Sequence, residues 1–360
     1  MRIEIYKPQG IMEMGKRDNQ EDAIFPTMEQ ATDNDRVFVL CDGMGGHEHG
    51  EVASQTVCAA ISEHLTTHWP IDGRVGDDLI LDALNAAYLA LDAKDDDTVG
   101  KKMGTTLTLV VLHKGGCTAV HVGDSRIYHL RPKERRILYR SRDHSLVTEL
   151  YQAGEISYEE MNTSKQKNII TKVLMPGEEN RVKPDIVHIG DLQSDDYLYL
   201  CSDGMVEQMD DEQLIRILCS HESDSNKRKK LIRKTADNND NHSALLIHVK
   251  KAKKRHDEHV VDDELETRCN FLNIKPIDID ALNKEIIEEQ TDEEIGELEL
   301  PAEMAPKPEQ EMAPASVPAQ TETNKHTDTS TQTNYRWCWV LLMAAIVILA
   351  ALVWYMSRES

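Results

Sequence analysis

The stretch VFVLCDGMGG, residues 37–46, joins an unbroken apolar run to an acidic residue and a glycine pair. The run has the length and the β-branched and aromatic content of a strand buried on both faces. It therefore predicts a strand over residues 36–41 that leads into Asp42-Gly43. A glycine directly after the aspartate lets a ligand or another stretch of backbone approach closely, because it carries no side chain.

The same pattern of an apolar strand followed by an aspartate recurs along the chain. The strand predicted over 197–201 leads into Asp203, the one over 117–122 leads into Asp124, and Asp240 precedes an apolar run at 244–249. Carboxylates that converge at the ends of buried strands repel one another and are costly to desolvate unless a cation joins them. Oxygen ligands without histidine or cysteine partners favour Mg²⁺ or Mn²⁺ over Zn²⁺. A turn or helix-cap role remains the alternative for each aspartate alone.

The remaining pattern of the first 250 residues predicts a layered α+β domain. Lys114-Gly115-Gly116 lies between two apolar runs and indicates a hairpin with antiparallel strands. Apolar residues at every third or fourth position indicate amphipathic helices between the strands. Beyond those already named, we predict strands at 105–113 and 126–130, and helices at 51–68, 77–94, 144–153, 211–220 and 226–237.

Composition narrows the function classes. The chain has 360 residues and a formal charge of −23, with 5% aromatic residues. Such an acidic chain, poor in stacking side chains, is not expected to bind nucleic acid. Its seven cysteines are scattered without a Cys-x-x-Cys pair, which is typical of a reducing compartment. The first ten residues contain no apolar run, so we expect no secretory signal.

Residues 252–335 differ in character from the domain predicted over 1–251. They contain 21 acidic and 8 basic residues, a net charge of −13, and are rich in proline and threonine. A segment with few apolar side chains and high charge cannot offset its chain entropy by burial. We therefore predict a disordered acidic linker, although leucine and isoleucine at helical spacing within 265–300 leave a short helix open.

The stretch WCWVLLMAAIVILAALVWYM, residues 337–356, contains no charged residue. Twenty residues in a helix span about 30 Å, the thickness of a bilayer's hydrocarbon core. Tryptophan and tyrosine stand at its ends, where interfacial anchors are expected. We therefore predict one C-terminal transmembrane helix over 336–356 and a short tail over 357–360. Arg336 and Arg358 flank it almost evenly, so charge does not decide its orientation.

Several segments occur together in an order that resembles a known family. Residues 15–23 (GKRDNQEDA) and 42–54 (DGMGGHEHGEVAS) are similar to two motifs of the PPM-type, protein phosphatase 2C-like, serine/threonine phosphatases in their bacterial form. Further matching segments are Gly104-Thr105-Thr106, residues 122–126, Asp143-His144-Ser145, Ser202-Asp203-Gly204 and Asp240-Asn241. The resemblance covers about residues 3–250. It implies a four-layer αββα sandwich of two antiparallel sheets.

The resemblance also implies roles for individual residues. The implied cofactors are two Mn²⁺ or Mg²⁺ ions, and a third ion is bound in some family members. Asp42 would bridge the two ions and the Gly43 carbonyl would bind the second. The other implied roles are Asp203 and Asp240 at the first ion, Glu21 at the second, Asp124 at the third, Asp22 as orienter of water, and Arg17 as binder of the substrate phosphate.

The implied reaction is hydrolysis of phosphoserine and phosphothreonine. A water activated by the two ions would attack phosphorus in line, opposite the serine or threonine oxygen, without a covalent phosphoenzyme. Met44 stands where many eukaryotic relatives have a histidine proposed as general acid, and we assign no acid role to His47. Residues 156–168 offer no clear partner for a third ion.

The implied partners are phosphorylated proteins, such as serine/threonine kinases or their substrates, and the lipid bilayer. Phosphoprotein substrates and reduced cysteines place the catalytic domain in the cytoplasm of a single-pass protein at the cell membrane. Two alternatives stay open. One is a catalytically inert relative that binds phosphoproteins, which loss of a ligand would favour. The other is an enzyme for small phosphorylated metabolites, which competition between phosphoprotein and sugar phosphates would distinguish.

Overall fold

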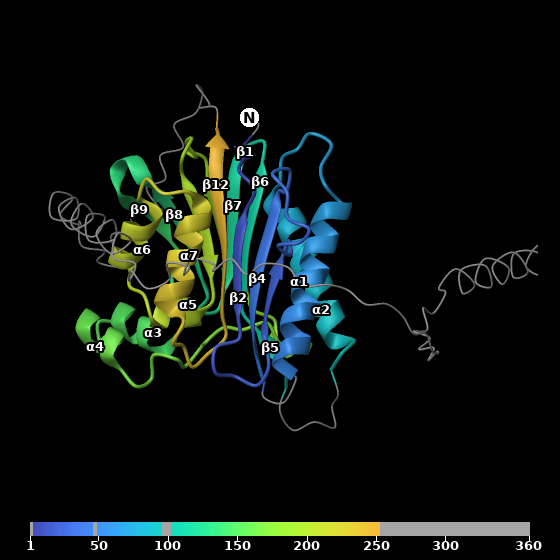
Figure 1. Ribbon diagram of the computed structural model, residues 1–360. Helices are drawn as coiled ribbons and strands as arrows, with labels where there is room; N and C mark the ends of the chain where they lie inside the picture. Colours follow the sequence, from blue (N-terminus) through green and yellow to red (C-terminus); the bar gives the residue numbers. More distant parts are fainter. Residues whose placement is uncertain (1–2, 46–48, 96–101, 253–360) are drawn as a thin grey trace, which may run out of the picture. The chain divides into compact units, whose positions relative to one another are not determined.

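Two antiparallel sheets stacked face to face form the centre of the domain (Figure 1). In the first sheet the strand order is β1-β12-β11-β8-β9, and β2 pairs with β12 beside β1. The strands are β1 (Glu4–Ile5), β2 (Gln9–Glu13), β8 (Arg126–Arg131), β9 (Arg136–Arg140), β11 (Tyr197–Cys201) and β12 (His242–Lys251).

The second sheet has the order β10-β7-β6-β4-β3, and β5 pairs with the end of β4. The predicted hairpin is confirmed, because β6 and β7 pair around Lys114-Gly115 with His113 opposite Gly116. The strands are β3 (Asp22–Phe25), β4 (Val37–Met44), β5 (Gly104–Thr105), β6 (Leu107–His113), β7 (Gly116–Val122) and β10 (Asp185–Ile189).

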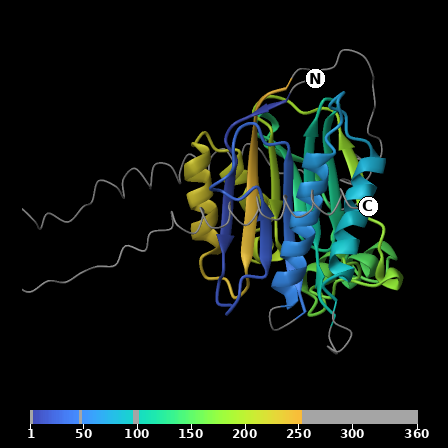
Figure 2. The same cartoon turned by 90° about the vertical axis from the view of Figure 1, so that its right-hand side faces the viewer.

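Helices cover the outer face of each sheet, so the domain has four layers (Figure 2). Helices α1 and α2 pack on the second sheet, and α6 and α7 pack on the first. The helices are α1 (His49–Thr67), α2 (Asp77–Asp92), α3 (Leu146–Gln152), α4 (Tyr158–Thr163), α5 (Asp203–Glu207), α6 (Asp211–Leu218) and α7 (Asp224–Thr235), with 3₁₀ turns at Pro132–Glu134 and Glu178–Asn180.

Strand β4 shows why the central strands are apolar throughout. Phe38 and Leu40 face the other sheet, whereas Val37, Val39 and Cys41 face helix α1. Side chains alternate along a strand, so burial of both faces removes the polar alternation seen in half-exposed strands. The apolar run of 37–41 is the direct result.

Two predicted strands differ from those observed. β4 continues through Asp42, Gly43 and Met44, because its end pairs with β3 and with β5. The strand predicted at 105–113 is interrupted at Thr106, because Gly104–Thr105 pairs with β4 before β6 begins.

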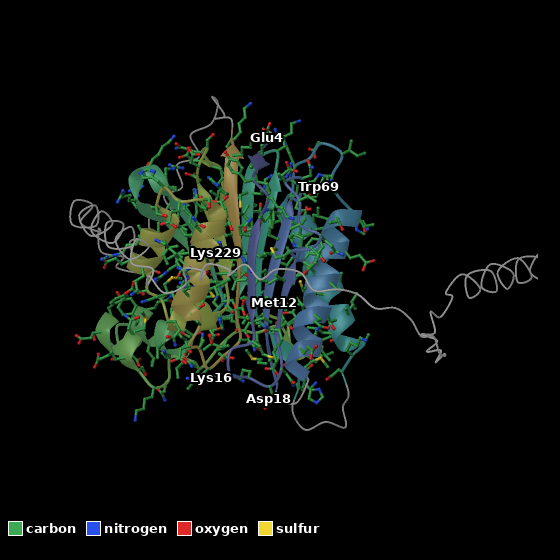
Figure 3. All side chains as sticks on the ribbon, in the orientation of Figure 1. Glu4, Met12, Lys16, Asp18, Trp69 and Lys229 are labelled. Atoms are coloured by element: carbon green, nitrogen blue, oxygen red, sulfur yellow. The ribbon has the colours of Figure 1, made fainter. Side chains whose placement is uncertain are left out.

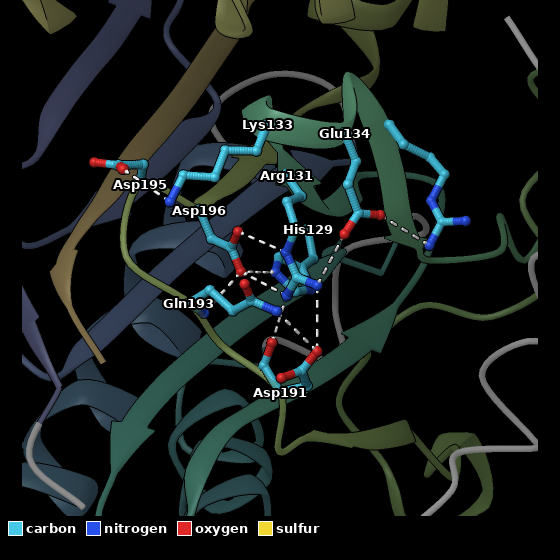
Figure 4. Close-up of polar contacts among 9 residues, drawn as sticks. His129, Arg131, Lys133, Glu134, Asp191, Gln193, Asp195 and Asp196 are labelled. Carbon is cyan, nitrogen blue, oxygen red and sulfur yellow. Dashed lines mark hydrogen bonds and ion pairs between the residues drawn. The ribbon is translucent and has the colours of Figure 1, made fainter. Parts of the chain in front are cut away.

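A buried polar network lies at the end of the first sheet where β12 finishes (Figure 4). The Asp196 carboxylate, 1% exposed, accepts hydrogen bonds from His129 Nε2 at 2.8 Å and from Arg131 Nε and Nη2, both at 3.0 Å. The backbone N–H of Gln193 donates to the same carboxylate at 2.9 Å. Although burial works against the charged form, the hydrogen bonds from His129 and Arg131 hold the pKa of Asp196 below its usual range.

The structure is a computed structural model and describes residues 3–45, 49–95 and 102–252. The predicted linker beyond Ala252, the predicted transmembrane helix at 336–356 and the tail at 357–360 lie outside the described residues. Within the described ranges, none of the helices combines the length and the apolar character needed to cross a bilayer.

Candidate metal centre

The chain brings its acidic residues to one end of the two sheets. β12 runs antiparallel to β11, so Asp240, just before β12, meets Asp203, just after β11. β3 pairs with β4, which sets Asp22 directly opposite Asp42. Lys16 and Asp18, in the loop that precedes β3, mark this end of the molecule in Figure 3, and Glu4 marks the opposite end.

Asp42 is held by its backbone. Its N–H donates to Thr106 Oγ1 at 3.0 Å, and its carbonyl accepts from Thr106 N–H and Thr105 Oγ1, both at 2.8 Å. By strand alternation its side chain lies on the same face as Phe38 and Leu40, between the sheets. The carboxylate therefore stands where the apolar layer between the sheets opens at its end.

Burial, and then the crowding of carboxyl groups, shifts the pKa values of these acids upward. Burial and the neighbouring charges of Asp22 and Asp203 raise the pKa of Asp42 well above its usual value. Burial raises the pKa of Asp22 to about 7 and that of Asp124 to about 8, with Asp203 as a further cause. Burial and Asp240 raise the pKa of Asp203 to about 6. The electrostatic neighbours of Asp42 are therefore the acids that the sequence predicted to converge.

Asp22 links the two sheets. Its Oδ2 accepts a hydrogen bond from Ser202 Oγ at 2.9 Å, and Ser202 Oγ in turn accepts from Ser243 N–H at 2.9 Å. Asp22 is 1% exposed, and its Oδ1 has no partner among the described residues. One oxygen is thus fixed by Ser202, and the side chain of Ser243 also lies close enough to lower the pKa that burial raises.

Asn241 orders the loop that carries Arg17 and Glu21, a role that the sequence analysis did not assign. Its Nδ2 donates to the carbonyls of Met14 at 2.9 Å and Asn19 at 3.0 Å, and its Oδ1 accepts from Glu21 N–H at 2.8 Å. A signal was present, because Asn241 is a polar residue next to Asp240 at the start of a buried strand. Its three bonds place the Glu21 backbone beside β12.

Glu21 is in contact with the first turn of helix α1. A side chain at Gly50 would lie 2.9 Å from Glu21 Cδ and 3.0 Å from its Oε2, and one at Gly43 would meet the Gly50 carbonyl. The Gly43 N–H also donates to the Glu21 carbonyl at 3.0 Å. Both glycines are therefore required for this close approach. Burial, with Asp240 and Glu51, raises the pKa of Glu21.

Arg17 reaches the acidic group from the loop. Its Nη2 donates to Asp240 Oδ2 at 2.6 Å, and its side chain is half exposed. Although burial disfavours its charged form, the hydrogen bond to Asp240 and the charges of Asp240 and Glu21 raise the pKa of Arg17. The guanidinium thus lies at the edge of the centre, accessible from solvent.

The donor types of these residues suit a hard divalent cation, although among the described residues it is His121, His144 and Asp185 that bring three ligand atoms within 4.8 Å of one another. The donors are carboxylate oxygens, the buried Asp22 Oδ1 and Asp124 Oδ1 lack partners among the described residues, and like charges meet in a buried place. A divalent cation would remove the repulsion that raises their pKa values. The residues predicted to hold it are Glu21, Asp42, Gly43, Asp124, Asp203 and Asp240.

Met44 and His242 do not join this group of oxygen donors. Met44 ends β4 beside Gly104, and His242 is buried with its Nδ1 3.0 Å from the Asp240 carbonyl. His47 lies outside the described residues. His242 is therefore held beside the Asp240 backbone, and we assign it no acid role.

A family model, protein phosphatase 2C, matches residues 10–238, well over half of the chain. This chain belongs to the protein phosphatase 2C family. It is thus an enzyme, a PPM-type serine/threonine protein phosphatase of the bacterial form, and the resemblance seen in its motifs is confirmed. Metal-dependent hydrolysis with Mn²⁺ or Mg²⁺ belongs to this family's chemistry.

Curated and solved relatives of this phosphatase agree with the family. A putative protein phosphatase 2C-type of Streptococcus pyogenes is 33% identical over 222 residues, which are 60% of this chain and 85% of the relative. The crystal structure of the serine/threonine phosphatase PstP/Ppp of Mycobacterium tuberculosis has a TM-score of 0.58 and 29% identity, over 68% of this chain and 99% of that one.

A second solved structure bears on the cofactor of this phosphatase. The catalytic domain of the serine/threonine phosphatase PstP, solved with two manganese ions, has a TM-score of 0.56 and 27% identity. The match covers 69% of this chain and 100% of that one.

The metal-free phosphatase should lose stability as the pH rises. Asp203, Asp22 and Asp124 have folded-state pKa values of about 6, 7 and 8, above the value of about 4 expected for an unfolded aspartate. Between pH 4 and these folded-state values, the folded protein binds more protons than the unfolded chain. The three carboxyl groups therefore contribute fully to the free energy of unfolding below pH 4, and this contribution is lost as the pH rises through 6–8. We expect the melting temperature in a chelator to fall from pH 5 to pH 8.5.

Mn²⁺ is the control for this pH effect. Added Mn²⁺ should raise the melting temperature more at pH 8 than at pH 5.5, because the ion competes with protons for the same oxygens. A melting temperature in chelator that stays level or rises over this range would contradict the assignment of shared acids.

Proposed function

We propose that this chain is a membrane-anchored, Mn²⁺- or Mg²⁺-dependent phosphatase that hydrolyses phosphoserine and phosphothreonine in proteins, with two ions at its centre. The observation that carries the proposal is the convergence of Asp42, Asp203 and Asp240 beside Glu21, with Arg17 at the solvent edge. Every side chain that the motifs predict as a metal ligand carries a carboxylate: Glu21, Asp42, Asp124, Asp203 and Asp240.

The chemistry divides between the ions and the side chains. When bound, the ions would acidify a water and neutralise charge on the phosphoryl group. Arg17 has a planar guanidinium that can donate to two phosphoryl oxygens at once, which would orient the ester for in-line attack. A bound phosphate would compete with Asp240 for this guanidinium, because Arg17 Nη2 donates a hydrogen bond to Asp240 Oδ2 at 2.6 Å.

Asp22 would orient the attacking water. Ser202 holds its Oδ2, so the unpartnered Oδ1 can accept a hydrogen bond from a water that enters the centre. At the position of Met44 there is a thioether, which cannot donate a proton. The proton for the leaving serine or threonine oxygen would then come from solvent.

The test of the activity uses the full chain in detergent and a phosphothreonine peptide. We expect phosphate release with Mn²⁺, none with a chelator, and recovery when Mn²⁺ is added back in excess. A matched sugar phosphate should be hydrolysed much more slowly. Inertness with Mn²⁺ towards phosphopeptides and phosphoproteins would refute the proposal, and a preference for the sugar phosphate would reassign the substrate.

The anchor is proposed from residues 337–356, with the catalytic domain in the cytoplasm. Replacing Ile346 and Leu349 by lysine would raise the free energy of inserting the helix by about 2.5–3.5 kcal/mol for each lysine near the middle of the membrane. We expect the unmodified chain in the carbonate-resistant membrane fraction and the Ile346→Lys, Leu349→Lys variant in the supernatant. Protease applied outside intact cells should leave the catalytic domain uncut. Digestion of the catalytic domain by this protease would show the opposite orientation.

A further inference from the structure

A second group of titratable side chains lies beside the turn that carries Asp124. His121 on β7, His144 after β9 and Asp185 on β10 place a nitrogen or oxygen atom each within 4.8 Å of one another. Both histidines are buried, and Asp185 is partly buried. In composition the group resembles a site for a transition metal.

The hydrogen bonds of His144 exclude that use. The N–H of Gly123 donates to His144 Nδ1 at 3.1 Å, so Nδ1 carries no proton and the ring is neutral with its hydrogen on Nε2. Nε2 faces Asp185 Oδ2 at 3.4 Å, and Lys172 Nζ lies 3.4 Å from the same nitrogen. A metal at Nε2 would have to displace that proton and contend with a nearby ammonium group.

The same bonds tie His144 to the turn that carries Asp124. His144 receives the Gly123 N–H on its ring, and its own backbone N–H donates to the Gly123 carbonyl at 2.8 Å. Gly123 has φ +108, and a side chain there would meet Thr106 Cγ2 at 2.6 Å. Both polar groups of the Gly123 backbone are therefore bound to a single residue, one position before Asp124.

The Asp185 carboxylate lies beside Nε2 of His144, with its Oδ2 at 3.4 Å. As an acceptor beside Nε2, its carboxylate favours the tautomer whose Nδ1 can accept from Gly123. His121 packs against the other side of the ring, with centroids 4.7 Å apart. Burial lowers the pKa of His121 to about 3, so this neighbour is a neutral ring that adds no charge.

We propose that Asp185 and His144 are positioning residues that hold the Gly123–Asp124 turn so that the Asp124 carboxylate faces the acidic centre. The inference rests on the proposed function in one respect, namely that Asp124 binds a divalent ion. Loss of a residue that orients a metal ligand lowers metal affinity about 10–100-fold. Asp185 therefore affects metal binding without touching the ion.

The test is a calorimetric titration of the full chain with Mn²⁺. Asp185→Ala should weaken the Asp124-dependent site about 10-fold, and the Asp124→Ala, Asp185→Ala double variant should be no weaker than Asp124→Ala. Asp185→Asn should bind Mn²⁺ much as the unmodified chain does, because the amide oxygen still accepts the Nε2 proton. Asp77→Ala is the matched control. Asp77, in helix α2, forms an exposed pair with His188, which lies on the same strand as Asp185, and the variant removes the carboxylate of that pair.

Two results would overturn the proposal. One is an Asp185→Ala chain that binds Mn²⁺ like the Asp77→Ala control. The other, which needs no variant, is a ¹⁵N spectrum of labelled histidine in the unmodified chain that puts the His144 proton on Nδ1. The titration requires no turnover, so a chain that binds Mn²⁺ as expected but hydrolyses nothing would defeat the proposed function and leave this inference standing.

Discussion

Replacing Asp42 by asparagine should lower the phosphatase activity by a factor on the order of 10³ and should also stabilise the metal-free protein. Asparagine keeps the size of the side chain and the backbone bonds to Thr105 and Thr106. It removes the carboxylate whose charge is disfavoured by burial and by Asp22 and Asp203. The substitution therefore removes the repulsion between this carboxylate and those of Asp22 and Asp203, which a bound metal ion would otherwise offset.

Two measurements on one sample check this result. Phosphopeptide turnover with saturating Mn²⁺ should collapse, and the melting temperature in chelator should rise. Asp237→Asn is the matched control, because Asp237 lies near the same end of the molecule but is 92% exposed and pairs with Lys16. It should change neither quantity appreciably. An Asp42→Asn chain with activity within tenfold of the original would exclude a central role for this carboxylate.

Replacing Asp196 by asparagine should destabilise the fold by about 3 kcal/mol, although this residue is remote from the acidic centre. Every partner of Asp196 donates: His129, two nitrogens of Arg131, and the Gln193 N–H. Whichever way the asparagine turned, its NH₂ group would face donors (Figure 4). The charge of the buried Arg131 would also lose its nearest counter-ion.

Asp195→Asn provides the same chemical change one residue away. Asp195 is half exposed, and its contacts with Lys133 at 3.8 Å and His248 at 4.0 Å are long. Surface pairs of this kind contribute about 0–1 kcal/mol. Asparagine also tolerates the positive φ of 72° found here. Urea unfolding of both variants should separate them clearly, and equal midpoints would contradict the account of the Asp196 network.

The buried strands could be predicted because burial on two faces leaves an unmistakable apolar run. β4, β7 and β11 are of this kind, and their ends located Asp42, Asp124 and Asp203. β10 could not be recognised in this way, because Asp185–Ile189 is only partly buried and contains a histidine that faces outward. β3 was missed for a related reason, since it is a short edge strand and begins with an aspartate.

The acids of the centre were predictable as a set, but their supporting contacts were not. Asp22 acts through Ser202, 180 positions away, and Glu21 is held by Asn241, 220 positions away. No local pattern in the sequence indicates such pairs, because they arise only when strands from the two sheets are brought together. The roles of Thr105 and Thr106 likewise depend on where β5 joins β4.

The direction of β12 has a consequence for access. This strand starts just after Asp240 and runs for ten residues to Lys251, a length of roughly 30 Å at about 3.4 Å per residue. The last described residue, Ala252, therefore lies on the side of the domain that faces away from the carboxylates. The end of β12 and the carboxylates thus lie at opposite ends of the first sheet, so a bulky phosphorylated protein can approach the carboxylates without meeting the end of this strand.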